Sequence, residues 1–139
     1  MTEIENMTKA EWQVMRIIWT LGQATSKEVI DILEKKTSWK TATIKTLIIR
    51  LQKKNFLTAD ESSRPYIYKP LIEETDAIHQ SVNNLFDSLC CMKKGNAIGD
   101  IIENSAISKG DIDDLISILQ DKKKEAPDEV ECDCLEANL

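Results

Sequence analysis

Three stretches of the first 54 residues repeat apolar side chains every three or four positions. The apolar positions are Trp12, Met15, Ile18 and Trp19 in the first stretch, Val29, Ile32 and Leu33 in the second, and Ile44, Leu47, Ile48 and Leu51 in the third. This spacing collects the apolar residues of each stretch on one face of an α-helix. The pattern therefore predicts three amphipathic helices, the third of which spans residues 39–54.

Helix start and stop signals frame the first two of these stretches. Thr8 with Glu11, and Thr25 with Glu28, have the spacing of a capping box, in which the hydroxyl and the carboxylate each accept a backbone N–H of the first turn. Gly22 is the kind of residue that commonly follows the last turn of a helix. We expect one helix to begin after Thr8 and end before Gly22, and another to begin after Thr25.

A β-hairpin is predicted after the third helix. Residues 56–59 and 66–70 read as strands, and the polar residues 60–65 between them are turn formers. Pro65 and Pro70 bracket the second strand, and we expect that strand to lie at an edge because proline cannot donate to a ladder. Three helices followed by a hairpin predict a winged helix-turn-helix, whose third helix enters the major groove of DNA while the hairpin lies along the backbone.

Helical spacing returns in the second half of the chain. It predicts helices over residues 73–94 and 96–104, separated by Gly95, and another that opens at Ser108 and runs to residues 122–124. These helices are too short and too few to bury their apolar faces alone, so we expect a second copy of the chain to cover them. The residues expected in that dimer interface are Leu85, Leu89, Leu115 and Leu119.

The predicted fold class is mainly α with a small β-hairpin wing, in three parts. Residues 1–70 form a winged-helix DNA-binding domain, residues 71–124 a helical dimerisation domain, and residues 125–139 a flexible acidic tail that contains Pro127. Composition agrees, since seven Gly and Pro in 139 residues favour helix, and 42% hydrophobic with 30% charged residues exclude a disordered chain.

Composition also narrows the classes of function. No apolar run is long enough for a membrane span, and the acidic, polar start does not resemble a signal peptide, so we expect a cytoplasmic protein with no membrane partner. The single histidine, His79, argues against a Ser-His-Asp hydrolase or a multi-histidine metal enzyme. No nucleophile–base pair or phosphate loop is visible, and we expect no enzyme.

The net charge of −6 conceals a division between the halves. Residues 1–70 carry twelve basic and eight acidic residues, whereas residues 71–139 carry six and sixteen. Seven Lys or Arg and no acid lie between Lys35 and Lys54. A basic run of this kind is either a solvated helix face or a surface for nucleic acid, and the winged-helix pattern favours the second.

The third predicted helix carries most of the candidate DNA-binding residues. Lys40 and Lys53 are placed for phosphates, and Thr43, Thr46 and Arg50 share one face, where arginine can grip guanine and a threonine methyl can touch thymine. Plain solvent exposure of the threonines is the alternative, as is an ordinary loop charge for Arg64 near the wing tip. The full predicted set is Lys40, Thr41, Thr43, Thr46, Arg50, Lys53 and Arg64.

The four cysteines form two pairs. Cys132 and Cys134 present two thiolates on the tail, which suits Cu(I) or Zn(II), although unused exposed thiols are the alternative. Two thiolates are half of a tetrahedral zinc site, so a second pair is needed, and two tails of a dimer could share one site. Cys90 and Cys91 are expected inside a helix, on different faces, as small packing residues.

Several of these segments resemble one known family. Residues 7–19 resemble the opening helix of the penicillinase-repressor/CopY family, residues 39–51 its recognition helix, and residues 53–57 the turn into its wing. Within the family, residues 39–46 and 94–99 look most like the copper-responsive CopY-type repressors. The resemblance covers about residues 7–124.

The resemblance implies a function and a mechanism. Copper repressors of this type are dimers on inverted-repeat operators of copper-export operons, in which a zinc-loaded form holds double-stranded DNA and Cu(I) releases it. The resemblance implies Cys132 and Cys134 as metal ligands. Such repressors carry two Cys-x-Cys pairs, whereas this chain has one, so either two subunits each lend a pair, or Cys90 and Cys91 contribute, or metal sensing is altered.

Two alternatives remain from the sequence. The β-lactam-responsive branch of the same family is inactivated by proteolysis at an Asn-Phe bond in the dimerisation region, and residues 99–103 have no such bond. A thiol-based metal buffer using Cys132 and Cys134 is the alternative from another class. Such a buffer would need neither a basic third helix nor a wing.

Overall fold

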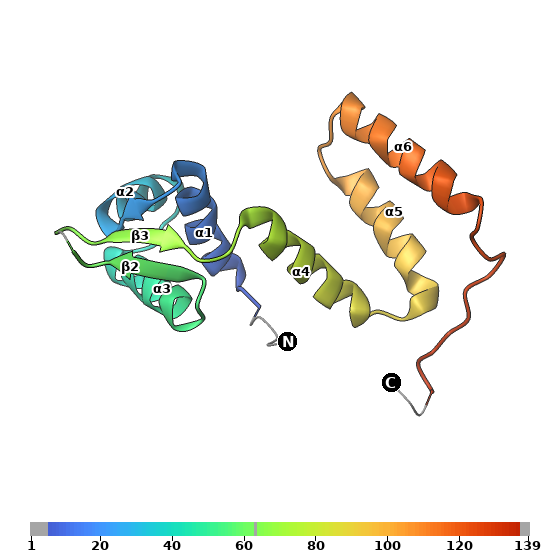
Figure 1. Cartoon of the computed structure of the whole chain (residues 1–139), viewed down its shortest axis with the longest axis horizontal. Coiled ribbons are helices and arrows are strands. Elements are labelled where there is room, and N and C mark those ends of the chain that lie inside the picture. The colour runs from blue at the N-terminus through green and yellow to red at the C-terminus, as the bar shows by residue number, and fades with distance from the viewer. Residues whose placement is uncertain (1–5, 63, 137–139) are drawn as a thin grey trace. The chain divides into compact units, whose positions relative to one another are not determined.

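A computed structural model of the chain describes residues 6–62 and 64–136 (Figure 1). The chain divides into two compact units, one ending at Val82 and the other beginning at Asn83. The elements in order are α1 (Lys9–Leu21), β1 (Ala24–Thr25), α2 (Ser26–Lys36), α3 (Thr41–Lys53), β2 (Leu57–Asp60), β3 (Ile67–Pro70), α4 (Glu74–Asp87), the short 3-10 helix η1 (Cys91–Lys93), α5 (Lys94–Asn104) and α6 (Lys109–Lys123). The mainly helical winged-helix architecture predicted from the sequence is confirmed.

The predicted capping signals set the boundaries of α1 and α2. Both boxes form completely: Glu11 N–H donates to the Thr8 hydroxyl over 3.2 Å while Thr8 N–H donates to the Glu11 carboxylate over 2.9 Å, and Thr25 does the same with Glu28. Gly22 ends α1 with a φ of 84°, a conformation that costs glycine little. Four side chains and one glycine thus suffice to fix where the first two helices begin and where α1 ends.

The core of the first unit is built from the three predicted apolar stripes. Ile44, Leu47, Ile48 and Leu51 of α3 are buried between α3 and the neighbouring helices α1 and α2, and Phe56 and Leu57 belong to the same cluster. The remaining buried members are Val14, Met15, Ile17, Ile18, Ala24, Val29, Ile30 and Leu33. Burying one face of α3 in this way leaves its opposite face on the surface.

The sheet differs from the prediction in one respect. The hairpin of β2 and β3 forms, but β3 is the central strand, because β1 pairs with its other side through Ala24 with Tyr68 and Thr25 with Ile67. The expectation of an edge strand was wrong. Proline is tolerated because β1 is only two residues long and stops short of Pro70, which is paired with β2 alone.

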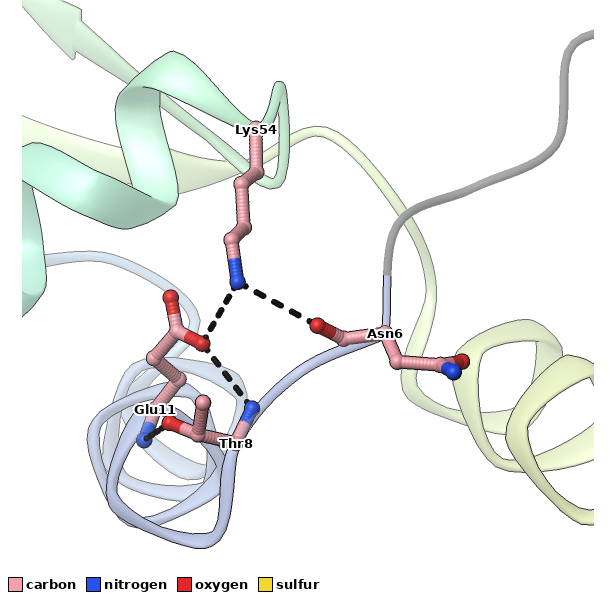
Figure 2. A network of polar contacts seen from close by, with 4 residues as sticks. All are labelled: Asn6, Thr8, Glu11 and Lys54. Atoms are coloured by element: carbon pink, nitrogen blue, oxygen red, sulfur yellow. Dashed lines mark hydrogen bonds and ion pairs between the residues drawn. The ribbon is translucent and has the colours of Figure 1, made fainter. Parts of the chain in front are cut away.

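A partly buried ion pair joins the end of α3 to the start of α1 (Figure 2). The ammonium of Lys54 donates to Oε1 of Glu11 over 2.8 Å and to the Asn6 carbonyl over 3.2 Å, and Thr8 N–H shares the same carboxylate oxygen. Burial opposes ionisation of Glu11, but the hydrogen bonds from Lys54 and Thr8 outweigh it and lower its pKa. The C-terminal end of α3 is thereby fixed against α1.

The other oxygen of this carboxylate is buried without a donor. Within the described residues, Oε2 of Glu11 has no hydrogen-bond partner, although the Glu11 side chain is fully enclosed. The hydrogen bonds that compensate for burying the charge are therefore all made to Oε1, and the Lys54 ammonium donates the main one.

The second unit is helical but has no core. The predicted helix over residues 73–94 ends earlier, at Asp87, and Cys90 instead occupies the N-cap position of η1 with a non-helical ψ of 132°. α6 begins with a third complete capping box, between Ser108 and Asp111. No described residue from Asn83 onward is buried. Among the described residues, none of the helices is long and apolar enough to cross a membrane.

Candidate nucleic-acid interface

The exposed face of α3 carries the residues predicted to read bases. Thr43, Thr46 and Arg50 are all exposed on the side away from the buried stripe, and Lys40 and Lys53 lie at the two ends of the helix. The helix starts without a side-chain cap, since Lys40 occupies the N-cap position. α3 therefore presents its exposed face between two cations, a suitable arrangement for a helix flanked by two phosphate strands.

The cations of this surface are not neutralised by the protein. In the part of the chain that the structure describes, none of them forms an ion pair with an acidic side chain: Lys40, Lys45, Arg50, Lys53 and Arg64. Lys45 was not among the predicted residues, although it belongs to the same acid-free run and is exposed on α3. Unpaired surface cations keep their full attraction for phosphate.

Two threonines of α3 have their hydroxyl groups engaged within the protein. The Thr46 hydroxyl donates to the Ala42 carbonyl over 2.9 Å, so its proton is used within the helix and its methyl group and oxygen lone pairs are left for a partner. The Thr41 hydroxyl donates to a carboxylate oxygen of Glu34 over 2.6 Å and links the start of α3 to α2. Thr41 thus has a positioning role in the structure that the sequence did not reveal.

Arg64 lies in the wing, between β2 and β3, and adds a cation to this surface. Its guanidinium lies over the ring of Tyr66, 5.3 Å from the centroid, which orients an otherwise exposed loop side chain. Tyr68 is half-buried and packs against the core, as expected for a residue that holds the wing to the helices.

A second group of candidate residues lies in the second unit. The sulfur atoms of Cys90, Cys132 and Cys134, here called the three-cysteine cluster, all lie within 4.8 Å of one another. Cys90 Sγ and Cys132 Sγ are 3.7 Å apart, and Cys134 N–H donates to Cys132 Sγ. The sequence grouped the two tail cysteines but assigned Cys90 to helix packing, and that assignment was wrong because α4 ends before Cys90.

The thiols of this cluster share hydrogen bonds, and their pKa values differ accordingly. The bond with Cys134, helped by the Met92 N–H and by Cys132, lowers the pKa of Cys90, whereas bonds to Cys132 and Cys90 raise the pKa of Cys134 to about 12. Of Cys90 and Cys134, Cys90 is therefore the sulfur favoured as thiolate, the form that binds metals.

Cys91 does not belong to this cluster. Its thiol hydrogen-bonds to the carboxylate of Asp133, which raises the pKa of Cys91 and lowers that of Asp133. The two adjacent cysteines thus have different partners. Cys90 lies beside two sulfur atoms, whereas Cys91 hydrogen-bonds to a carboxylate.

Comparison with known proteins assigns the chain to a family. A family model described as penicillinase repressor matches residues 7–121, most of the chain. The chain belongs to the penicillinase repressor family. This is a family of transcriptional repressors and not of enzymes.

The chain is also similar to individual known proteins. The chain is 43% identical to an uncharacterised 16.5 kDa protein from the ptsI 3′ region of Latilactobacillus sakei, over 93% of this chain and 88% of the relative. It is 30% identical to the penicillinase repressor of Bacillus licheniformis, over 88% and 96%. A solved structure of the CopR repressor is 40% identical, covering 50% of this chain and 100% of its own, with a TM-score of 0.42.

The match to the penicillinase repressor family covers some of the candidate residues and not others. Residues 7–121 include all of α3, the wing and Cys90, but end before Cys132 and Cys134. The candidate DNA-binding surface therefore lies inside the matched region, and the tail pair of cysteines lies outside it.

Proposed function

We propose that the chain is a dimeric DNA-binding repressor of a copper-export or copper-resistance operon, which leaves its operator when its thiolates take up Cu(I). The observation that carries the DNA-binding part is the exposed face of α3, where the described cations are unpaired and no acidic residue intervenes. The copper response draws its support from the tail cysteines and from the resemblance of residues 39–46 and 94–99 to copper-responsive repressors.

The residues of the surface divide into two roles. Lys40, Lys53 and Arg64 neutralise phosphates, which gives affinity that falls with salt and is independent of sequence. Arg50 and Thr46 contact base edges in the major groove, Arg50 through a bidentate pair with guanine and Thr46 through its free methyl group. Thr43 shares this face and completes the reading surface.

Dimerisation follows from the exposed apolar side chains of the second unit. Leu85, Ile116 and Leu119 are about half exposed in the single chain, and grouped exposed apolar side chains are typical of a surface that a protein partner covers. A second copy covers them, and the resulting two-fold axis requires an inverted-repeat operator with half-sites about one helical turn apart.

Binding to duplex DNA is tested by fluorescence anisotropy with a labelled promoter of a copper-export operon from the source organism and with a scrambled duplex. Arg50→Ala should cost about 1–3 kcal/mol on the promoter and little on the scrambled duplex. Lys53→Ala should weaken both equally and reduce the salt slope by about 1. Equal losses on both duplexes for Arg50→Ala contradict base reading. Failure of the wild-type chain to bind either duplex would instead favour a thiol-based metal buffer.

The β-lactam-responsive alternative is supported by the 30% identity to a penicillinase repressor. It predicts induction by a β-lactam together with cleavage of the chain. A reporter fused to the promoter distinguishes the two: the copper proposal expects induction by copper with the chain intact on an immunoblot. Induction by a β-lactam, with a shortened chain, would reject the copper proposal.

A further inference from the structure

The three-cysteine cluster joins two segments that are far apart in the sequence. Cys90 follows α4 at the start of η1, whereas Cys132 and Cys134 lie in the segment after α6, and 42 residues separate Cys90 from Cys132. Cys90 is half-buried and both tail cysteines are exposed, and all three are free thiols. The tail thus meets the α4–η1 junction through sulfur atoms.

The spacing of the sulfur atoms matches that of ligands around one metal ion. With metal–sulfur bonds of about 2.3 Å, two thiolates lie roughly 3.8 Å apart on a tetrahedral ion and roughly 4.0 Å apart on a trigonal one. The observed 3.7 Å between Cys90 and Cys132, and the limit of 4.8 Å for all three sulfurs, fall in this range. Small rotations of the side chains are enough to bring all three onto one ion.

The donor set favours one class of metal. Three sulfurs converge, and no further His, Cys, Asp or Glu of the described residues joins the group. Cys91 is held by Asp133 instead. Zinc wants four ligands, so three leave its coordination incomplete, whereas soft thiolates in low number suit Cu(I).

We propose that Cys90 is the third ligand of a Cu(I) site formed within a single chain by Cys90, Cys132 and Cys134. This inference rests on the copper response proposed above and names its ligands. It replaces a site shared between the tails of two subunits by one that each chain completes alone. Any ligand sulfur that still carries a proton gives that proton to solvent as it binds the ion.

The position of the third ligand gives the metal a structural effect. Binding ties the tail to the residue that separates α4 from η1, and so closes a loop that contains α5 and α6. These are the helices with the exposed apolar faces proposed to form the dimer, so copper occupancy and dimer geometry become linked through covalent connectivity.

Adjacent cysteines provide the matched test. The full-length reduced chain is titrated anaerobically with Cu(I) in competition with a chromogenic Cu(I) chelator, as wild type, Cys90→Ser and Cys91→Ser. Wild type should bind about one Cu(I) per chain. Cys90→Ser should lower the affinity at least about tenfold, since even outer contacts to metal ligands are worth that much, while Cys91→Ser should stay within about twofold. X-ray absorption should show three sulfurs around copper in wild type and Cys91→Ser, and fewer in Cys90→Ser.

Equal affinities for the two variants would overturn the proposal, as would one copper ion or cluster per two chains that disappears only with Cys132→Ser and Cys134→Ser. Failure of the inference is distinct from failure of the proposed function. If Cys90→Ser binds Cu(I) normally while copper still releases wild-type chain from DNA, only the third ligand is wrong. If copper binds with three sulfurs but leaves the DNA complex intact, the site stands and the copper response fails.

Discussion

The two units have similar helices but opposite burial. Every buried apolar side chain of the described residues lies before Asn83, and several of them, such as Leu33, Leu51 and Val14, have no exposed surface. In α5 and α6 the isoleucines and leucines at equivalent helical positions remain open, for example Ile118 at 60% and Leu119 at 54%. Both units have a complete capping box at a helix start.

This difference shows that the signals that start a helix are distinct from the packing that stabilises a fold. Caps and propensity decide where a helix begins, but short helices gain most of their stability from packing. The winged-helix unit supplies this packing from its own three helices and hairpin. The second unit has the same local signals and lacks a partner surface, which is the basis for proposing that a second copy of the chain covers it.

The strongest prediction separates the units physically. A fragment of residues 1–82 should unfold cooperatively in urea and remain monomeric, because it retains the whole core, including Ala77 and the Ile72 carbonyl that accepts the Trp19 indole. A fragment of residues 83–139 should gain helix, measured by circular dichroism, only as its concentration rises. Concentration-independent folding of the second fragment would contradict the comparison.

One leucine from each unit tests the same contrast with single substitutions. Leu51→Ala should destabilise the chain by about 2–5 kcal/mol, because Leu51 is fully buried. Leu119→Ala should leave the unfolding of the winged-helix unit within about 0.5 kcal/mol and instead weaken dimerisation. Urea denaturation and sedimentation equilibrium measure the two effects. A large loss of winged-helix stability from Leu119→Ala would show that the units are not independent.

The partly buried ion pair of Lys54 and Glu11 provides a prediction specific to the first unit. Lys54→Met should cost about 1–3 kcal/mol, because it leaves the enclosed carboxylate of Glu11 with only the Thr8 N–H as a donor. Lys53→Met is the matched control, since Lys53 is exposed and unpaired among the described residues, and should change stability by about 0.5 kcal/mol or less. Equal effects of the two substitutions in urea denaturation would remove the role given to the pair.

The same pair predicts a pH dependence. The pKa of Glu11 is lower in the folded chain than its ordinary value of 4.5, so its contribution is present above about pH 4.5 and is lost as the pH falls below that value towards the folded pKa. Stability of the wild-type chain should therefore fall more steeply between neutral and acid pH than that of Glu11→Gln. Parallel curves for the two proteins would contradict this assignment.

The smallest expected effect compares the same cap in both units. Thr8→Ala should lower the stability of the winged-helix unit by about 1 kcal/mol through loss of the α1 cap. Ser108→Ala removes the equivalent cap of α6. It should leave the stability of the winged-helix unit unchanged, because α6 belongs to the second unit. Thermal unfolding of the full chain resolves the two. A shift of the winged-helix transition by Ser108→Ala would show coupling between the units.

The local signals of the sequence predicted the helix starts well. The capping boxes at Thr8, Thr25 and Ser108 all form, because each needs only two side chains three residues apart. The residues of α3 were predicted to within two positions at its start, since four buried side chains at helical spacing leave little choice of face.

Features that depend on distant partners escaped prediction. β1 has only two residues, too few for an alternating pattern, and without it β3 was assigned to an edge. No glycine or proline marks the end of α4, so its apolar spacing extended the predicted helix through Cys90. Cys90 and Cys132 are 42 residues apart in the sequence, and no residue pattern near Cys90 indicates that its sulfur lies beside those of the tail.

Thr25 belongs to two elements at once. Its backbone pairs with Ile67 of the wing, and its side chain caps α2. The same residue thus ties the central strand of the wing to the first turn of α2, and β3 and β2 also contact α1 and α3, so the wing and the helices form one packed body. A partner that meets such a body orders fewer degrees of freedom on contact, and more of the interaction energy remains as affinity.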